Sequence, residues 1–106
     1  MFRDRDPFSD VPLVKMGSLF NRNIIVLDYA IVAGHTKPGG RFIRKDYVTR
    51  HIVVMVQVDG KKARVKSESR NLELKLIRSK TRLPVETIIY RTRYGPRFSK
   101  FSRVYN

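Results

Sequence analysis

The sequence predicts a mainly β protein that folds as a small antiparallel barrel with extended N- and C-terminal arms. Three observations support this class: a β-branched run over residues 23–32, a nearly continuous apolar run over 52–58, and an Asp-Gly pair that follows it at once. The chain has 106 residues, 42% of them hydrophobic, which suits one domain with its own core. Its expected parts are an N-terminal arm, the barrel and a basic aromatic tail, over residues 1–22, 23–94 and 95–106.

The first two strands are predicted from their side chains. Residues 23–32 are rich in β-branched residues and should form the first strand, which ends in a glycine-rich loop over 34–40. The second strand is expected from about residue 41 to residue 58. Its apolar run over 52–58 indicates burial on both faces for part of its length.

A tight hairpin is predicted at Asp59-Gly60, which stands between two β-type runs. A type I′ turn needs positive φ at both central positions, and an Asp-Gly pair meets that requirement. Residues 61–65 should therefore pair back onto the second strand. Because side chains alternate along a strand, Ala63 and Val65 point inward, and the other face collects three cations, Lys62, Arg64 and Lys66.

Residues 72–77 allow two interpretations. The leucines in this segment recur with period two, which favours a strand, whereas Leu, Glu and Lys are good helix formers. We expect a strand here. A further strand is expected over residues 85–93, with Pro84 before it and Gly95-Pro96 as its end.

Charge is the strongest compositional signal. The chain holds 23 Lys and Arg against nine Asp and Glu, a formal net charge of +14. Residues 1–59 contain nine basic and six acidic side chains, whereas residues 60–106 contain fourteen and three. Solubility alone needs a net charge of only ~2–8 for a small domain, so this excess indicates nucleic-acid binding, mainly through the C-terminal half.

The sequence offers little material for catalysis. The absence of cysteine excludes disulfides, Cys-ligated zinc and thiol chemistry, and no apolar run approaches the ~20 residues that span a bilayer. His35 and His51 stand far apart with no carboxylate pattern nearby. The glycine-rich loop lacks the P-loop signature, because Gly40-Arg41 stands where Lys and Ser or Thr are required. We therefore expect no enzyme, metal, cofactor or small-molecule substrate.

Residues 90–105 suit RNA better, because cations alternate with aromatic side chains there. Arg matches phosphate with a planar fork, and aromatic rings can stack on unpaired bases, cap the barrel's own core or fill a groove of a neighbouring protein. No helix-turn-helix, zinc-finger or basic-zipper pattern is present, which favours folded RNA over duplex DNA. The predicted RNA contacts are Lys37, Arg41, Arg44, Lys45, Lys61, Lys62, Arg64, Lys66, Arg91, Arg93, Tyr94, Arg97, Phe98, Lys100, Phe101 and Arg103.

Two short motifs resemble a known family. Gly40-Arg-Phe-Ile-Arg-Lys45 resembles the pattern Y-G-K-F/Y-I-K-R, and residues 85–100 resemble a strand followed by R-P-L-S-K-T-K. Both patterns are found in the OB-fold family of small-subunit ribosomal protein seventeen; its H-D pair is replaced here by His51-Ile-Val. The resemblance implies an OB-like barrel docked on rRNA through residues 34–45 and the C-terminal segment. The strand pattern by itself also allows an SH3-like barrel.

The leading hypothesis is a structural constituent of a ribosome. It would bind rRNA through the basic barrel face and the tail, and neighbouring ribosomal proteins through the terminal arms. We expect a mitochondrial ribosome, with a cytoplasmic ribosome or a virion as alternatives. The first ten residues contain three Asp and do not resemble a secretory signal. The competing hypothesis is a viral or phage nucleocapsid-type protein that coats nucleic acid without sequence specificity.

Overall fold

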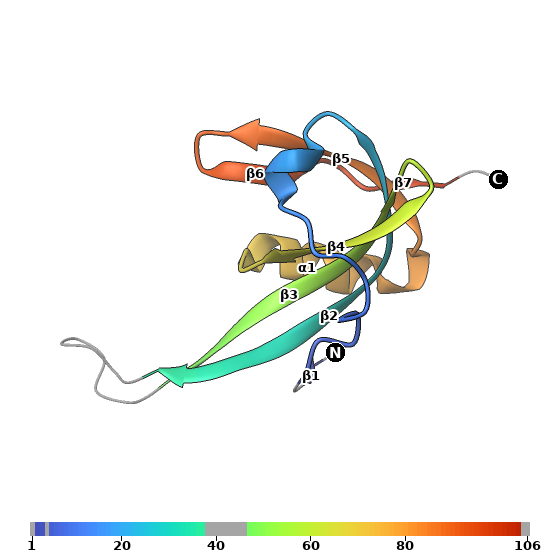
Figure 1. The fold of residues 1–106 in the computed structure, drawn as a ribbon. Helices are drawn as coiled ribbons and strands as arrows, with labels where there is room; N and C mark the ends of the chain where they lie inside the picture. Colours follow the sequence, from blue (N-terminus) through green and yellow to red (C-terminus); the bar gives the residue numbers. More distant parts are fainter. Residues whose placement is uncertain (1, 4, 38–46, 105–106) are drawn as a thin grey trace.

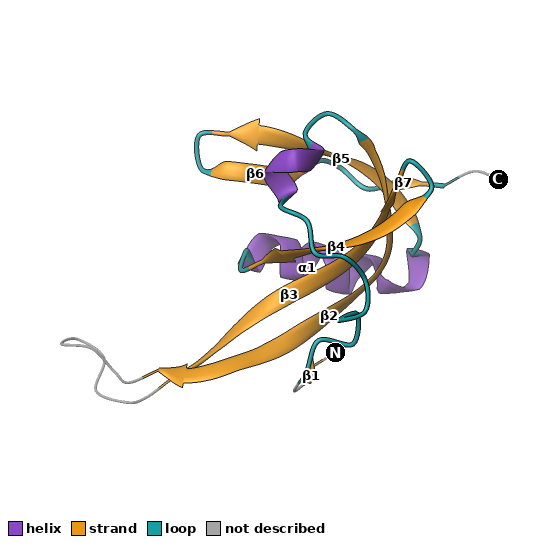
Figure 2. Cartoon of the chain, viewed as in Figure 1, coloured by secondary structure: helices purple, strands orange, loops and turns teal. Residues whose placement is uncertain are grey.

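The computed structural model of the chain describes residues 2–3, 5–37 and 47–104. Figure 1 shows a strongly curled antiparallel sheet with one short α-helix beneath it, and Figure 2 shows how far strands dominate. The predicted mainly β class is confirmed, in the form of a half-barrel. The elements are β1 (Phe2–Arg3), η1 (Met16–Leu19), β2 (Asn23–Lys37), β3 (Tyr47–Val58), β4 (Lys61–Ser67), α1 (Arg70–Ser79), η2 (Lys80–Arg82), β5 (Val85–Thr92), β6 (Gly95–Phe98) and β7 (Ser102–Arg103).

The sheet has the strand order β4-β3-β2-β5-β6, with β7 added to β5 and β1 lying parallel beside β2. β2 is the central strand, because it pairs with β3 along most of its length and with β5 near its start. The chain thus makes a three-stranded meander, passes through α1, and returns as a hairpin whose first strand joins the opposite edge of β2. This return is what curls the sheet around its core.

β2 is longer than the sequence predicts. The expected loop begins at Gly34, but pairing with β3 continues to Lys37 through an irregularity between Ala33 and Thr36. A glycine inside a strand is tolerated at such a bulge, so Gly34 does not end the strand. The predicted start of the second strand, at residue 41, lies outside the described residues, and the described part of β3 begins at Tyr47.

The turn between β3 and β4 confirms the hairpin prediction. Asp59 has φ 53° and Gly60 has φ 78°, both positive as a type I′ turn requires. β4 then pairs antiparallel with β3 from Lys61 to Ser67. The Asp-Gly pair was sufficient to predict this turn, because a type I′ turn depends on the backbone angles of only these two residues.

The core fills the concave face of the curled sheet. Alternate residues of the strands point into it, and Leu72 and Leu76 of α1 close it from one end. In β3, Ile52 and Val54 face the core while Val53, which faces the other way, is also fully buried. The predicted burial on both faces is therefore confirmed. The main strand residues of the core are Ile24, Val26, Tyr29, Ile31, Ile52, Val54, Val56, Val65, Val85, Ile89 and Phe98.

The strand prediction for residues 72–77 is wrong, because this segment lies within α1. Leu72 and Leu76 are four positions apart, so they share one helix face and are buried, while Leu74 is exposed. Ser69 caps the helix by accepting a hydrogen bond from the Leu72 amide at 3.3 Å. Glu73 forms an ion pair with Arg50 of β3 at 3.2 Å. Tertiary packing therefore selected the four-residue spacing over the two-residue one.

The N-terminal segment, expected as an extended arm, packs on its own sheet. The Pro12 carbonyl accepts from the Arg64 amide at 2.8 Å, and the Val14 amide donates to the Arg64 carbonyl at 2.9 Å, so this segment covers the edge of β4. After η1, the Asn21 amide donates to the Ile89 carbonyl of β5 at 2.9 Å. Residues 12–21 thus span the open side of the half-barrel from β4 to β5, as Figure 1 shows.

The C-terminal segment also differs from the expectation. The strand predicted over residues 85–93 is confirmed as β5, which ends at Thr92 before Gly95-Pro96, but Gly95 then begins a further strand, β6, which pairs back onto β5 from Phe98 to Gly95. Gly95 has φ 107°, which allows the chain to reverse after Tyr94. β7 pairs with the start of β5. Six residues of the predicted tail, 95–98 and 102–103, therefore belong to the sheet. No helix in the described part of the chain is long and apolar enough to cross a membrane.

Candidate nucleic-acid interface

The predicted RNA contacts divide into groups that the fold places differently. Arg41, Arg44 and Lys45 lie outside the described residues, and Lys37 ends β2, with its side chain also outside them. The other twelve lie on β4, on the β5–β6 hairpin and in the segment from Phe98 to Arg103. Each of these three regions has a different charge environment.

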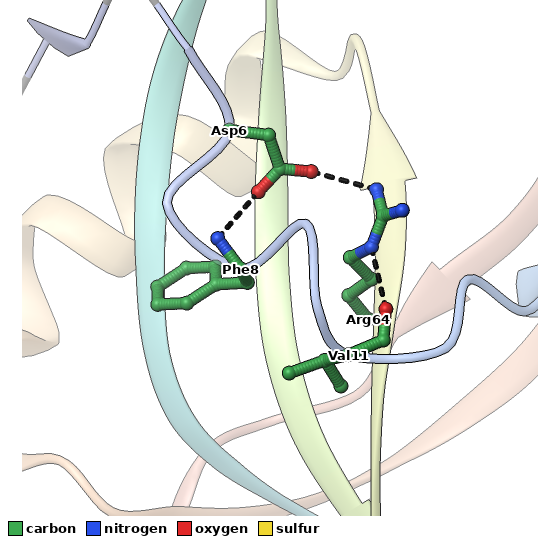
Figure 3. Close-up of polar contacts among 4 residues, drawn as sticks. All are labelled: Asp6, Phe8, Val11 and Arg64. Carbon is green, nitrogen blue, oxygen red and sulfur yellow. Dashed lines mark hydrogen bonds and ion pairs between the residues drawn. The ribbon is translucent and has the colours of Figure 1, made fainter.

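On β4, Lys61, Lys62 and Lys66 are exposed, but Arg64 is not. Its side chain is 15% exposed, and its Nη1 lies 2.7 Å from Oδ2 of Asp6. Its Nε donates to the Val11 carbonyl at 2.7 Å (Figure 3). Charge-assisted bonds of this length are strong. Arg64 therefore holds the N-terminal segment, which differs from the predicted outward-facing phosphate contact.

The other Asp6 oxygen completes this contact. Oδ1 accepts a hydrogen bond from the Phe8 amide at 2.8 Å, which turns the chain so that it crosses the sheet. In the view of Figure 3 the chain passes from Asp6, between β2 and β3, across β3 to Val11 beside β4, and the Phe8 ring lies between β2 and β3. Val53 is fully buried although it points away from the core. The N-terminal segment thus covers part of the outer face of the meander.

The β5–β6 hairpin has the opposite character. Arg91, Arg93 and Arg97 are exposed, and none has a carboxylate within 4.0 Å in the described part of the chain. Cζ of Arg91 lies 5.0 Å from the ring centroid of Phe20, and Cζ of Arg97 lies 6.0 Å from that of Tyr94. Tyr94 is 78% exposed. The hairpin therefore presents cations and an aromatic ring to the outside, as the sequence predicts.

Phe98 does not have the position expected of the RNA contact that the sequence predicts. It is 8% exposed and belongs to the core, so it has no free face to offer a base. Phe101 is partly buried and meets Phe98 edge to face, with ring centroids 6.3 Å apart. These two rings cap the core, which was the alternative interpretation. Lys100 and Arg103, between and beyond them, are exposed.

Lys75 on α1 is a structural cation that the sequence did not single out. Its Nζ donates to the Ser99 carbonyl and to the Phe98 carbonyl, the latter at 3.4 Å, and lies 4.4 Å from the Phe101 ring centroid. Burial lowers the pKa of Lys75 from its ordinary value. This residue ties the helix to the C-terminal segment. No local pattern distinguishes it from the exposed lysines, because its role depends on residues more than twenty positions away.

Carboxylates neutralise few of the cations in the described part of the chain. In the described residues, three ion pairs form: Arg22 with Asp59 at 3.2 Å, Arg50 with Glu73 at 3.2 Å, and Arg64 with Asp6 at 2.7 Å. All three use a cation outside the β5–β6 hairpin. No carboxylate follows Glu86 in the sequence. The exposed cations of the hairpin and of the residues after it are therefore not neutralised by carboxylates of the described residues, and the same holds for Lys61, Lys62 and Lys66 of β4.

The described residues contain no group of three or more His, Cys, Asp or Glu side chains that could hold a metal ion. His51 lies on β3, and its buried Nε2 finds no hydrogen-bond partner in the described part of the chain. Burial, and then the charge of Lys66, lower the pKa of its imidazole, while Asp6 and Glu68 act in the opposite direction. The side chain of His35 lies outside the described residues.

The comparisons with known proteins add no family. No protein-family model, curated protein or solved structure matches this chain.

Proposed function

We propose that this chain is a structural RNA-binding protein, a non-enzymatic subunit of a ribosome that binds rRNA through its β5–β6 hairpin and the cations around it. The observation that carries the proposal is the set of exposed arginines on this hairpin, which have no carboxylate within 4.0 Å in the described residues. A protein with a net charge of +14 repels itself unless a polyanion neutralises it. Folded RNA supplies that charge, and single-stranded segments in it can stack on exposed rings.

We infer further that the half-barrel is of the OB type. The support is its connectivity: a three-stranded meander, then a helix, then a hairpin whose first strand pairs with the first strand of the meander. An OB-fold is a five-stranded, partly open Greek-key barrel. The N-terminal residues 12–21 bridge the open side between β4 and β5. This order of elements favours an OB-like barrel over an SH3-like one.

The assembly is the second part of the proposal. OB-fold barrels bind nucleic acid through strand faces and loops, but here the outer face of β3 and β4 is partly covered by residues 6–11. RNA would therefore contact the hairpin side first. Neighbouring ribosomal proteins would meet exposed apolar residues of the terminal segments, such as Leu13. We propose a mitochondrial ribosome, because the chain matches the ribosomal motifs only in part and a divergent mitochondrial member would depart from them in this way.

A salt titration tests RNA binding. The affinity of the full chain for a structured rRNA fragment should fall with salt, with a slope of several units in log K against log salt concentration, because each phosphate contact contributes about 0.7 to 0.9. Changing Arg91, Arg93 and Arg97 together to Gln should reduce that slope by about 2 to 3 units. A flat salt response of the unmodified protein would contradict the proposal.

A matched variant separates a site from bulk charge. Arg70, Arg78 and Arg82 are exposed on and after α1, and changing them to Gln removes the same charge. This control should reduce the slope by less than one unit. If the two triple variants reduce the salt slope equally, the RNA contacts are spread over the surface.

The assembly is tested by co-sedimentation of the tagged chain with ribosomal subunits from mitochondria and from the cytoplasm. Enrichment with one small subunit supports the proposal. If the chain instead forms discrete oligomers in native mass spectrometry and binds any RNA in proportion to its length, the nucleocapsid-type alternative is correct.

A further inference from the structure

A cavity of about 150 Å³ opens between the β5–β6 hairpin and the start of α1. Ser67 at the end of β4 and Asn71 in the first turn of α1 line one side, and Tyr90 and Arg97 of the hairpin line the other. Figure 1 shows the hairpin extending above α1, with η1 beside it. Pockets for drug-sized ligands measure roughly 300–1,000 Å³. This one therefore suits a single small planar group.

The lining has the chemistry of a base-binding site. Tyr90 offers an aromatic ring and is 43% exposed. Met16 of η1 adds an apolar surface. Arg97 supplies a cation with no carboxylate within 4.0 Å, and none of the described side chains that line the cavity is acidic. An aromatic face, an apolar wall and a cation are the features that hold a nucleobase and its phosphate.

Most of the other polar groups in the lining are already used. Ser69 Oγ accepts from the Leu72 amide, and Ser67 Oγ accepts from the Ser69 amide at 3.1 Å. Lys75 donates to the carbonyls of the C-terminal segment. The side-chain amide of Asn71 and the hydroxyl of Tyr90, by contrast, make no hydrogen bond within the described residues. An amide offers both donors and an acceptor, which match the Watson–Crick edge of an unpaired base.

We propose that this cavity takes one unpaired nucleobase of the bound RNA. The base stacks on Tyr90, the Asn71 amide hydrogen-bonds to its edge, and Arg97 contacts the adjoining phosphate. This inference rests on the proposed function and adds to it that the chain recognises a bulged or looped nucleotide in addition to charge. A fully paired helix cannot place a base in the cavity, because its bases are stacked inside the duplex.

Two RNAs test the inference with the full chain. One is a hairpin with a single bulged 2-aminopurine, a fluorescent base; the other has the same stem without the bulge. The protein should bind the bulged RNA more tightly and change the 2-aminopurine fluorescence. Tyr90→Leu should lower the affinity for the bulged RNA by about 5- to 150-fold, the range expected for one base stacked on an aromatic ring, and leave the affinity for the paired stem unchanged.

Ile88→Ala is the matched control. Ile88 lies two positions before Tyr90 on the same face of β5, is 39% exposed, and lies outside this cavity. It should keep the preference for the bulged RNA. Asn71→Ala, on the exposed side of the helix, should reduce that preference even if Tyr90→Leu lowers stability. Tyr90→Phe should keep most of it, because the ring remains.

The outcomes separate this inference from the proposed function. If both RNAs bind equally with strong salt dependence, and Tyr90→Leu and Asn71→Ala change nothing, the chain binds RNA but the cavity holds no base. If neither RNA binds in a salt-dependent way, the proposed function fails and the base site fails with it. A preference for the bulge that persists in both variants would assign recognition to another surface.

Discussion

β4 and the β5–β6 hairpin each carry three exposed cations, but β4 also carries Arg64, whose charge is neutralised within the chain. On β4 the central cation, Arg64, is 15% exposed and is paired with Asp6. On the hairpin, Arg91, Arg93 and Arg97 are exposed and have no such partner among the described residues. The count of cations in a segment therefore does not measure the charge that a ligand meets. What matters is which acidic residues the fold brings to them.

The source of the difference is the distribution of carboxylates along the chain. Six of the nine acidic residues lie in residues 1–59, and the N-terminal segment carries one of them, Asp6, across the sheet to β4. Residues 87–106, which include most of the hairpin, contain no Asp or Glu. The cations of the hairpin can therefore be neutralised only by carboxylates from elsewhere in the chain or by another molecule.

The largest effect on stability is expected at the Asp6–Arg64 ion pair, which holds the N-terminal segment on β4. Asp6→Ala leaves the Arg64 guanidinium without its carboxylate and the Phe8 amide without its acceptor. The free energy of unfolding should fall by about 2–3 kcal/mol, below the cost for a fully buried pair because both side chains keep some exposure. Urea denaturation measures this loss. Asp10→Ala, which removes the same charge from an exposed position, should change stability by less than about 0.5 kcal/mol.

The corresponding contact on the hairpin side is made by Lys75. Lys75→Met keeps the aliphatic stem but removes the donor to the Ser99 and Phe98 carbonyls. We expect a loss of about 1–2 kcal/mol in the free energy of unfolding, since hydrogen bonds from charged groups contribute more than neutral ones. Thermal and urea unfolding measure it. Lys80→Met, at an exposed lysine after α1, is the control, and an equal loss there would contradict a specific role for Lys75.

Single arginines compare the two regions directly in RNA binding. Arg93→Gln should weaken binding by about 5- to 8-fold at ~0.1 M salt, the effect of losing one phosphate contact. Arg64→Gln should weaken it by less than about 2-fold, because its charge is already neutralised by Asp6. Both are measured by fluorescence anisotropy at a temperature where each variant is folded. If Arg64→Gln has the larger effect, RNA displaces the N-terminal segment from β4.

The smallest effect concerns pH at the covered face. The pKa of His51 is lower in the folded protein than its ordinary value of 6.5, chiefly through burial. Below that value the unfolded chain binds a proton that the folded chain does not, so stability falls as pH drops from 6.5 toward the folded pKa. His51→Gln should reduce this dependence between pH 7.5 and 5.5. Urea midpoints of the unmodified protein and of His51→Gln at the two pH values test this. The same change in midpoint between pH 7.5 and 5.5 in the two proteins would contradict it.

Local patterns predicted some elements well. Asp59-Gly60 predicted its hairpin because a type I′ turn depends on two backbone angles that these residues favour. The apolar run over 52–58 predicted a strand with buried residues on both faces, and Ile52, Val53 and Val54 are all buried. The exposed positions of Arg91, Arg93 and Tyr94 followed from the polar character of the segment. In each case the signal lies within a few neighbouring residues.

Other features depended on partners far along the chain. The leucines over 72–76 fit a strand or a helix, and the choice was made by a core that receives Leu72 and Leu76 together. Phe98 looked like a ring available for stacking, but it fills the core beside Ile89. Lys75 and Arg64 look like ordinary surface cations, yet each bonds to groups more than twenty residues away. No local pattern encodes such pairings.

The sequence by itself determined a mainly β chain, one tight hairpin and a large excess of positive charge, because alternation, turn chemistry and net charge are local or additive properties. Only the tertiary structure decided which of the described cations are paired with a carboxylate and which residues line the cavity beside α1. Those outcomes depend on the N-terminal segment crossing β4 and on the hairpin returning over α1. Both are contacts between segments distant in sequence, and their geometry is settled only when the sheet curls around its core.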